Sequence, residues 1–267
     1  MPVSLQGLID IHCHLLPGLD DGAVSWEESV ALARLAAADG ISTVIATPHQ
    51  LGRYREVRAE RIRALVVQLQ QVLRQQNVDL CVLAGADVRI EPEVVGKIQS
   101  GEVVTLADRR RHVLLELPHE VCPPLDQLLG HLHQAGLSGI LSHPERNRAI
   151  QAEPNLVGRL VHAGWLIQIT AASLTGTFGS RARSVAEWLV QQGLVHFVAT
   201  DAHSTMARPP VLSRAWTRVV ELAGPDLAEE WFRTNPGAVI AGRDVMSGPR
   251  KTPKPAWFGW VRRRKAG

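Results

Sequence analysis

The chain has 267 residues, of which 45% are hydrophobic, enough for one large domain with a sizeable core. Its net charge of +3 comes from the basic last twenty residues, and the remainder is mildly acidic, which argues against a nucleic-acid-binding domain. The first residues do not have the pattern of a signal sequence, and no apolar run is long enough to span a membrane. The three cysteines (Cys13, Cys81 and Cys122) are scattered and odd in number, which argues against a disulfide framework. We therefore expect a cytoplasmic protein.

Short apolar runs alternate with longer segments of helical periodicity along the chain. The apolar runs predict strands over residues 7–14, 42–47, 80–88, 112–118, 138–143, 165–170 and 196–200. Apolar residues at three- and four-residue spacing predict helices over residues 25–40, 56–76, 123–136, 155–164, 180–193 and 212–224. Seven strand–helix units in series predict an α/β protein with a parallel (β/α)7 TIM-like barrel, and an open doubly wound sheet is the alternative.

Two segments are expected along the chain. Residues 1–247 form the predicted domain, and residues 248–267 form a basic, aromatic tail that we expect to be disordered. The alternative for the tail is peripheral contact with an anionic membrane, which attracts clustered Lys and Arg. Within the domain, Ser25 with Glu28 three residues later predicts a capped helix start.

The first predicted strand carries an unusual polar pattern in "LIDIHCH". Asp10, His12 and His14 stand at every second position, so on a strand they share one face. Such a face is either exposed to water or built around an ion. Cys13 between the histidines is expected to point the other way and to pack in the barrel wall.

Potential metal ligands recur where the other predicted strands end, in "ATPHQ", "GADV", "LLELP", "SHPER" and "ATDAHS". Side chains at the carboxyl ends of barrel strands meet in one site. Imidazole with carboxylate and without thiolate suits Mn²⁺, Fe or Zn²⁺, and so many ligands predict two or three ions that activate water and bind oxyanions. The predicted ligands are His12, His14, His49, Asp87, Glu116, His143, Asp201 and His203.

Two arginines follow these ligand segments closely. Arg146 in "HPERNR" and Arg208 in "DAHSTMARPP" are expected to bind phosphate oxygens, because a guanidinium contacts two of them at once. The alternative for each is an arginine in a surface salt bridge. The remaining histidines are expected to be structural or exposed: His112, His119, His131, His133, His162 and His196.

The motifs "DIHCH", "TPH", "HPER" and "TDAH", in this order, resemble the polymerase-and-histidinol-phosphatase (PHP) superfamily. The longer pattern "DIHCHLLPGLDDGA…TPH…HPERN…DAH…RPP" is similar to the bacterial manganese-dependent protein tyrosine phosphatases of capsule and exopolysaccharide operons, over residues 7–245. The resemblance implies a distorted seven-stranded barrel, a trinuclear metal centre and the ligand set given above. Asp87 stands where that branch usually has Glu, and Gln50 where it often has His. Asp20 and Asp21 match a signature turn without an assigned role.

The resemblance further implies dephosphorylation of the tyrosine-rich tail of a bacterial tyrosine autokinase, a cytoplasmic reaction that regulates polysaccharide synthesis. The expected chemistry is in-line attack of an activated water on phosphorus, without a covalent phosphoenzyme. A small-molecule phosphomonoesterase such as histidinol-phosphate phosphatase is the alternative, and a non-catalytic, metal-stabilised scaffold is a remote one. No nucleic-acid partner is expected, and the sequence leaves the oligomeric state open.

Overall fold

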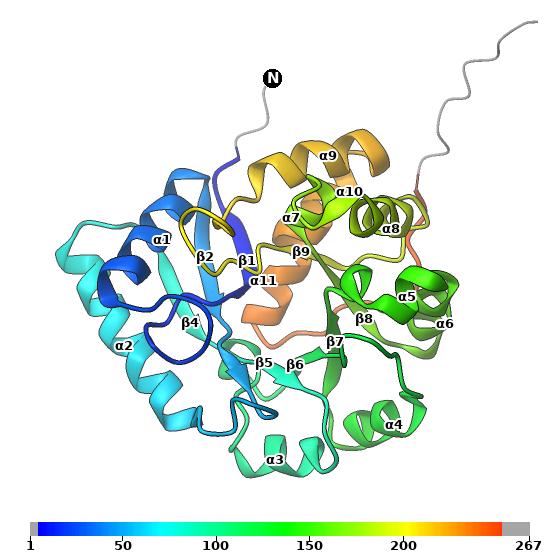
Figure 1. The fold of residues 1–267 in the computed structure, drawn as a ribbon, viewed down its shortest axis with the longest axis horizontal. Helices are drawn as coiled ribbons and strands as arrows, with labels where there is room; N and C mark the ends of the chain where they lie inside the picture. The colour runs from blue at the N-terminus through cyan, green and yellow to red at the C-terminus, as the bar shows by residue number, and fades with distance from the viewer. Residues whose placement is uncertain (1–4, 253–267) are drawn as a thin grey trace, which may run out of the picture.

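A computed structural model describes residues 5–252 of the chain, with strands at the centre and helices around them (Figure 1). The strands of this range form two parallel sheets, ordered β1-β2-β4 and β3-β5-β6-β7-β8-β9. Their bounds are β1 Leu8–Cys13, β2 Ile41–Ala46, β3 His49–Gln50, β4 Cys81–Ala84, β5 Asp87–Arg89, β6 His112–Glu116, β7 Ser138–Ser142, β8 Leu166–Thr170 and β9 Phe197–Ala199.

Two of the predicted strands correspond to pairs of observed strands. The run 42–47 continues through Pro48 into β3, and the run 80–88 is interrupted after β4 before it resumes as β5. Proline has no N–H for the ladder, and at Gly85 a Cβ would lie only 2.6 Å from Ile45 Cγ2, so only glycine fits there. The pieces stay side by side, since Gly85 N–H donates to Ala46 O (2.9 Å) and Asp87 N–H donates to Pro48 O (3.2 Å).

The barrel closes between the first and last strands. Cys13 forms a parallel bridge with Ala202, and Asp201 N–H donates to His12 O at 2.7 Å, while His14 N–H donates to Ala202 O at 2.8 Å. Counting each broken pair as one strand, the described residues contain the seven predicted strands in a closed parallel arrangement. The predicted TIM-like barrel is confirmed, and the open sheet is excluded.

All six predicted helices are present among the described residues, and shorter ones are added between them. Ser25 caps the first helix as predicted, because its Oγ accepts from Glu28 N–H at 3.3 Å, while the Glu28 carboxylate accepts from Val24 N–H at 3.0 Å. The helices are α1 Trp26–Ala38, α2 Ala59–Gln75, α3 Val94–Ser100, α4 Asp126–Gln134, α5 Arg148–Ala152, α6 Asn155–Ala163, α7 Ala171–Leu174, α8 Gly179–Gln191, α9 Ser213–Ala223, α10 Pro225–Glu229 and α11 Asn235–Ile240. Short turns are η1 Leu106–Asp108, η2 Pro144–Arg146 and the π-helical η3 Glu230–Thr234.

The interior of the barrel has two layers of side chains, an apolar layer and a polar layer that lies nearer the carboxyl ends of the strands. Leu114, Ile140 and Leu166 belong to one small buried cluster, together with Val239 of α11. Two residues further along the same strands stand Glu116, Ser142 and Gln168. Because side chains alternate along a strand, these polar groups lie on the same inward face, one layer nearer the carboxyl end. The larger apolar cluster, which includes Cys13 as expected, packs the strands against the surrounding helices.

The C-terminal segment leaves the barrel along its outer surface. Arg250 N–H donates to Gly193 O at 2.7 Å, its Nε donates to Glu230 at 2.5 Å, and Thr252 Oγ1 donates to Gln191 O at 2.7 Å. The first residues of the predicted tail thus contact the domain, and residues 253–267 lie outside the described range. Among residues 5–252, no helix combines the length and apolar character needed to cross a membrane.

Candidate metal centre

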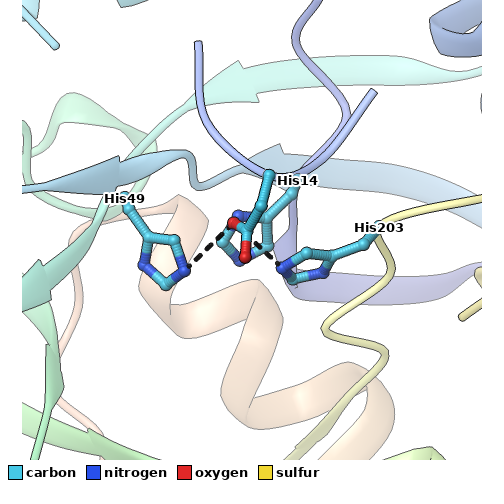
Figure 2. A group of neighbouring side chains, drawn as sticks. His14, His49 and His203 are labelled. Carbon is cyan, nitrogen blue, oxygen red and sulfur yellow. Dashed lines mark ion pairs between the residues drawn. The ribbon is translucent and has the colours of Figure 1, made fainter. Parts of the chain in front are cut away.

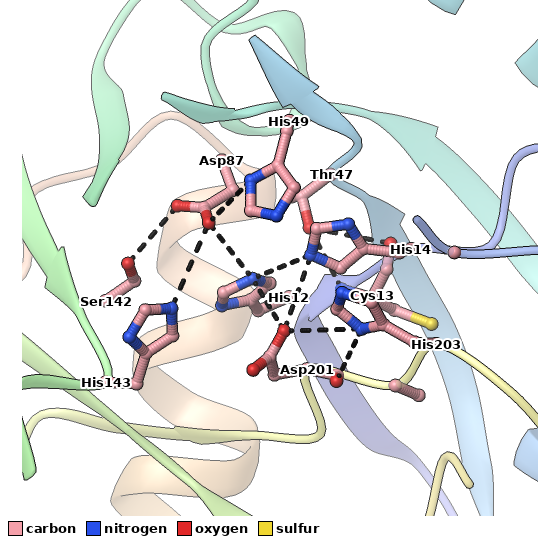
Figure 3. A network of polar contacts seen from close by, with 12 residues as sticks. His12, Cys13, His14, Thr47, His49, Asp87, Ser142, His143, Asp201 and His203 are labelled. Carbon is pink, nitrogen blue, oxygen red and sulfur yellow. Dashed lines mark hydrogen bonds and ion pairs between the residues drawn. The ribbon is translucent and has the colours of Figure 1, made fainter. Parts of the chain in front are cut away.

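All eight predicted metal ligands lie close together at one end of the barrel, and Figure 3 labels each of them except Glu116. Together with Asp21 they form four overlapping groups in which the potential ligand atoms lie within 4.8 Å of one another. The groups are His12 with His14 and Asp87; His12 with His143 and Asp201; His49 with Asp87 and Glu116; and His14 with Asp21, His49 and His203. The sequence therefore identified residues that the fold brings together from six separate segments.

Asp87, at the start of β5, is the carboxylate shared by two of these groups. Its Oδ1 accepts a hydrogen bond from Ser142 Oγ at 3.2 Å, whereas its Oδ2 is buried and makes no hydrogen bond with the described residues. Three imidazole nitrogens lie around Oδ2: His49 Nδ1 at 3.3 Å, His12 Nε2 at 3.6 Å and His143 Nε2 at 4.0 Å. A buried carboxylate oxygen without a hydrogen bond is costly unless a cation compensates it.

The two histidines of β1 and its extension aim their Nε2 atoms at each other. His12 Nδ1 lies 2.9 Å from Gln168 Oε1, and His14 Nδ1 lies 2.7 Å from Asp20 Oδ2. These oxygens accept hydrogen bonds, so each Nδ1 carries the proton and the Nε2 atoms, 3.2 Å apart, are the ligand atoms. Burial disfavours a charged His14, but the carboxylates of Asp20 and Asp201 together outweigh burial and raise the pKa of His14 to about 10. In the protein without a cation, a proton on His14 Nε2 satisfies the contact between the two Nε2 atoms.

Asp201 joins the histidines to the two arginines. Its Oδ1 lies 3.3 Å from His12 Nε2 and 3.4 Å from His14 Nε2. Its Oδ2 accepts hydrogen bonds from both Arg146 and Arg208. The Asp201 carboxylate therefore directs one oxygen at the ligand cluster and its other oxygen at two guanidinium groups. The predicted phosphate-binding role of these arginines stays a prediction, although they lie beside the centre as it requires.

The arginines are further held by an aromatic ring from the start of α8. The guanidinium carbon of Arg146 lies 4.3 Å from the Phe178 ring centroid, and that of Arg208 lies 5.4 Å from it. Cation–π contact attracts both side chains to the ring face. Phe178 was not identified from the sequence, because a single aromatic residue before a helix gives no sign of its partners.

Asp21 is a further member of the cluster that the sequence did not identify as a ligand. Its Oδ1 lies 3.5 Å from His49 Nε2 and 3.6 Å from His203 Nε2, and Figure 2 shows these two histidines with His14 around one carboxylate. The "DDG" turn was the available signal. Gly22 lets the turn fold back onto the strand end, because a Cβ there would lie 2.3 Å from His14 O.

The neighbouring Asp20 holds the cluster from behind. Besides its contact with His14, Asp20 Oδ2 accepts from His49 N–H at 2.8 Å, and its Oδ1 accepts from Gly22 N–H at 3.0 Å. Burial raises the pKa of a carboxyl, but the His14 imidazolium and the two backbone N–H groups outweigh burial and lower the pKa of Asp20 to about 2. Asp20 therefore stays ionised and fixes the orientation of one predicted ligand and the backbone of another.

Asp10 does not join His12 and His14 in the cluster, although all three stand at alternate positions. Its carboxylate accepts hydrogen bonds from Thr200 N–H at 3.0 Å and Thr200 Oγ1 at 2.5 Å. The pairing of β1 with β2 shifts register between Asp10 and Cys13, so the alternation of faces is interrupted there. Asp10 instead ties β1 to the segment that carries Asp201.

The donor set fits cations. Burial, followed by repulsion from Asp87, raises the pKa of Glu116 to about 7, which shows how closely the carboxylates are crowded. A cation would relieve this repulsion, would satisfy Asp87 Oδ2, and would replace the proton on His14. Imidazole nitrogens and carboxylate oxygens are the donors that Mn²⁺, Fe and Zn²⁺ accept. The described residues therefore form a candidate site for more than one divalent metal ion.

Comparison with known proteins agrees with this geometry. Tyrosine-protein phosphatase YwqE of Bacillus subtilis is 38% identical over 202 residues, covering 75% of this chain and 79% of that protein. Tyrosine-protein phosphatase CpsB of Streptococcus pneumoniae is 28% identical over 238 residues, covering 87% of this chain and 98% of that protein. A crystal structure from work on YwqE and CpsB, described as unique metal-dependent tyrosine phosphatases, matches with a TM-score of 0.86 and 33% identity, over 92% of this chain and 100% of that chain.

The family model "Capsular polysaccharide synthesis, CpsB/CapC" matches residues 8–241, which include every predicted ligand and both arginines. The chain therefore belongs to the CpsB/CapC family of capsular polysaccharide synthesis, as the resemblance of its motifs predicted.

Proposed function

We propose that this protein is a metal-dependent tyrosine-protein phosphatase that acts in capsule or exopolysaccharide synthesis. The observation that carries the proposal is the division of Asp201, which directs one oxygen to His12 and His14 and the other to Arg146 and Arg208. A phosphoryl group bound at this junction meets the metal ligands and two guanidinium groups together. The tyrosine-phosphatase names of the relatives and the capsular family description support the same conclusion.

The ligand groups overlap, so two or three ions share them, and we propose Mn²⁺ as the native metal with Fe or Zn²⁺ as alternatives. Such ions, when bound, make water a stronger nucleophile at neutral pH and neutralise charge on phosphoryl oxygens. The ligands in this proposal are His12, His14, His49, Asp87, Glu116, His143, Asp201 and His203, as predicted from the sequence, with Asp21 added from the structure.

The chain's own groups bind and orient the phosphate ester. Arg146 and Arg208 exchange part of their contact with Asp201 for the phosphoryl oxygens, whose charge they neutralise as the ester bond breaks. Phe178 keeps the two guanidinium groups in place while this exchange occurs. The leaving phenol has a pKa near 10, far below that of an alkyl alcohol, so it departs with modest assistance.

We further propose that the substrate is the phosphorylated tyrosine-rich tail of a bacterial tyrosine autokinase in the cytoplasm. The family description and the tyrosine-phosphatase relatives support a protein substrate of this class. The three cysteines lie in the described range as free thiols, in keeping with a reducing compartment.

The test measures hydrolysis of a phosphotyrosyl peptide and of histidinol phosphate by the purified protein loaded in turn with Mn²⁺, Fe²⁺ or Zn²⁺. We expect a higher kcat/KM on the peptide. A variant with His12→Ala and His14→Ala should lose turnover together with its metal content, measured by inductively coupled plasma analysis. Arg148→Gln is a control, because Arg148 is exposed and pairs with Glu120 at 3.1 Å.

Two results contradict the proposal. A metal-free double variant that still hydrolyses phosphotyrosine would exclude the metal-dependent reaction. Preference for histidinol phosphate over the phosphotyrosyl peptide with every metal would instead assign the small-molecule phosphomonoesterase activity.

A further inference from the structure

An open pocket of about 360 Å³ begins at the candidate metal centre and extends over the loop that follows β3. His49 and Glu116 of the centre line it, together with Arg53, Tyr54 and Arg89. The pocket thus shares two residues with the centre. A peptide whose phosphotyrosine reaches the centre places a neighbouring residue within reach of this pocket.

Two arginines give the pocket positive charge. Arg53 Nη2 lies 3.3 Å from Asp21 Oδ2, and its side chain is 74% exposed. Arg89 Nη1 lies 3.7 Å from Glu116 Oε2 and donates to Leu117 O at 2.9 Å. Each guanidinium has five N–H donors, so these contacts leave several of them available to an incoming anion.

The acidic partners of both arginines belong to the metal-ligand groups. Asp21 and Glu116 lie in two different groups of the candidate centre, so their charge is directed toward cations as well as toward Arg53 and Arg89. When cations at the centre neutralise these carboxylates, less negative charge is left to compensate the positive charge of the two arginines. The pocket is therefore more strongly positive when the centre is loaded, which is the state that binds substrate.

Tyr54 supports this arrangement. Its ring stacks on the His49 imidazole, with centroids 5.0 Å apart and planes 13° apart, and the Arg53 guanidinium carbon lies 4.7 Å from the Tyr54 centroid. The ring is already in contact with a ligand and with a pocket arginine. The feature that the pocket offers to a substrate is thus its pair of guanidinium groups.

We propose that Arg53 and Arg89 form a specificity subsite that binds the carboxylate of an Asp or Glu next to the phosphotyrosine of the substrate. The proposal rests on the phosphatase function proposed above and adds a preference for acidic phosphopeptides. A guanidinium matches a carboxylate with two parallel hydrogen bonds. The scissile phosphate has its own arginines at Asp201, so the subsite takes a second anionic group.

The test compares two phosphotyrosyl peptides that are identical except that glutamates on both sides of the phosphotyrosine are replaced by glutamines. The wild-type protein should show a higher kcat/KM on the glutamate peptide. In Arg53→Ala and in Arg89→Ala, the glutamate-to-glutamine ratio should fall roughly two- to fivefold, the range for partly exposed ion pairs. For matched peptides carrying a non-hydrolysable phosphonate, the glutamate-to-glutamine ratio of dissociation constants should rise by the same factor, because the variants lose their preference for the glutamate peptide.

Arg58→Ala is the matched control. Arg58 is 61% exposed, pairs loosely with Glu56 at 3.9 Å and lies five residues from Arg53 on the same segment, outside the pocket lining. Its variant should keep the wild-type ratio, which separates the subsite from a general effect of positive charge. The ratio also cancels any change in the chemical step that the substitutions cause.

The outcomes distinguish the two proposals. Equal kcat/KM for the glutamate and glutamine peptides in the wild type, or an unchanged ratio in both arginine variants, would overturn the subsite and leave the phosphatase function intact. Absence of hydrolysis of either peptide by the metal-loaded protein would overturn both. A fall in the ratio with Arg58→Ala as large as that with Arg53→Ala would also exclude the subsite.

Discussion

Replacement of Asp20 by Asn should weaken metal binding although Asp20 belongs to none of the ligand groups. The Asp20 carboxylate accepts from His14 Nδ1 at 2.7 Å, from His49 N–H at 2.8 Å and from Gly22 N–H at 3.0 Å. An amide cannot accept at all three, because its NH₂ group meets a donor in any orientation. If the NH₂ group faces His14, the imidazole places its proton on Nε2 and that atom is lost as a ligand.

The expected magnitude follows from this change of tautomer and charge. Loss of a hydrogen-bonding partner behind a metal ligand costs about 10- to 100-fold in metal affinity, or roughly 1.4 to 3 kcal/mol. The mutation should also change the protons released on binding. Asp20, with Asp201, raises the pKa of His14 to about 10 in the protein without a cation, so at pH 7 an incoming ion displaces a proton from His14.

The assay is a titration of chelator-treated protein with Mn²⁺ by isothermal calorimetry in buffers of different ionisation enthalpy. It gives both the dissociation constant and the number of protons released. Asp20→Asn should raise the dissociation constant and lower the proton release. Asp79→Asn is the control, since Asp79 is exposed and this substitution is the same isosteric change outside the cluster. Equal dissociation constants and equal proton release in wild type and Asp20→Asn, with circular dichroism showing both folded, would refute the role of Asp20.

Two further predictions concern the arginines and the acid stability. Arg146→Gln or Arg208→Gln should lower kcat/KM for p-nitrophenyl phosphate by about 10- to 100-fold, the value of a hydrogen bond to a charged group. The loss of kcat/KM in the double variant should be smaller than the product of the two single losses, because both arginines contact Asp201. Losses that multiply strictly would contradict this shared role. Burial, followed by Arg111, lowers the pKa of His112 to about 4. The folded pKa lies below the unfolded value of 6.5, so stability is lost as pH falls below 6.5. Between pH 7 and 5, the free energy of unfolding measured with urea should fall by about 2 kcal/mol less in His112→Leu than in wild type. An identical fall in both proteins would contradict the prediction.

The fold could be read from the sequence because its local signals agree. Each strand is a short apolar run, each main helix has a three- to four-residue apolar period, and units of this kind close into a barrel with few alternatives. The breaks at Pro48 and Gly85 were not predicted, since they depend on packing between neighbouring strands. Closure at Cys13 and Ala202 likewise joins residues almost two hundred positions apart.

The sequence by itself determined all the imidazoles and all but one of the carboxylates that gather at the centre, because the carboxyl ends of parallel strands converge wherever the chain places them. Only the tertiary structure decided how they are oriented. The return of the "DDG" turn brings Asp21 to the histidines and Asp20 behind them, and a register shift in β1 sends Asp10 to Thr200 instead. Local patterns specify residues on an element, but loop returns and bulges depend on contacts between segments that are distant in the chain.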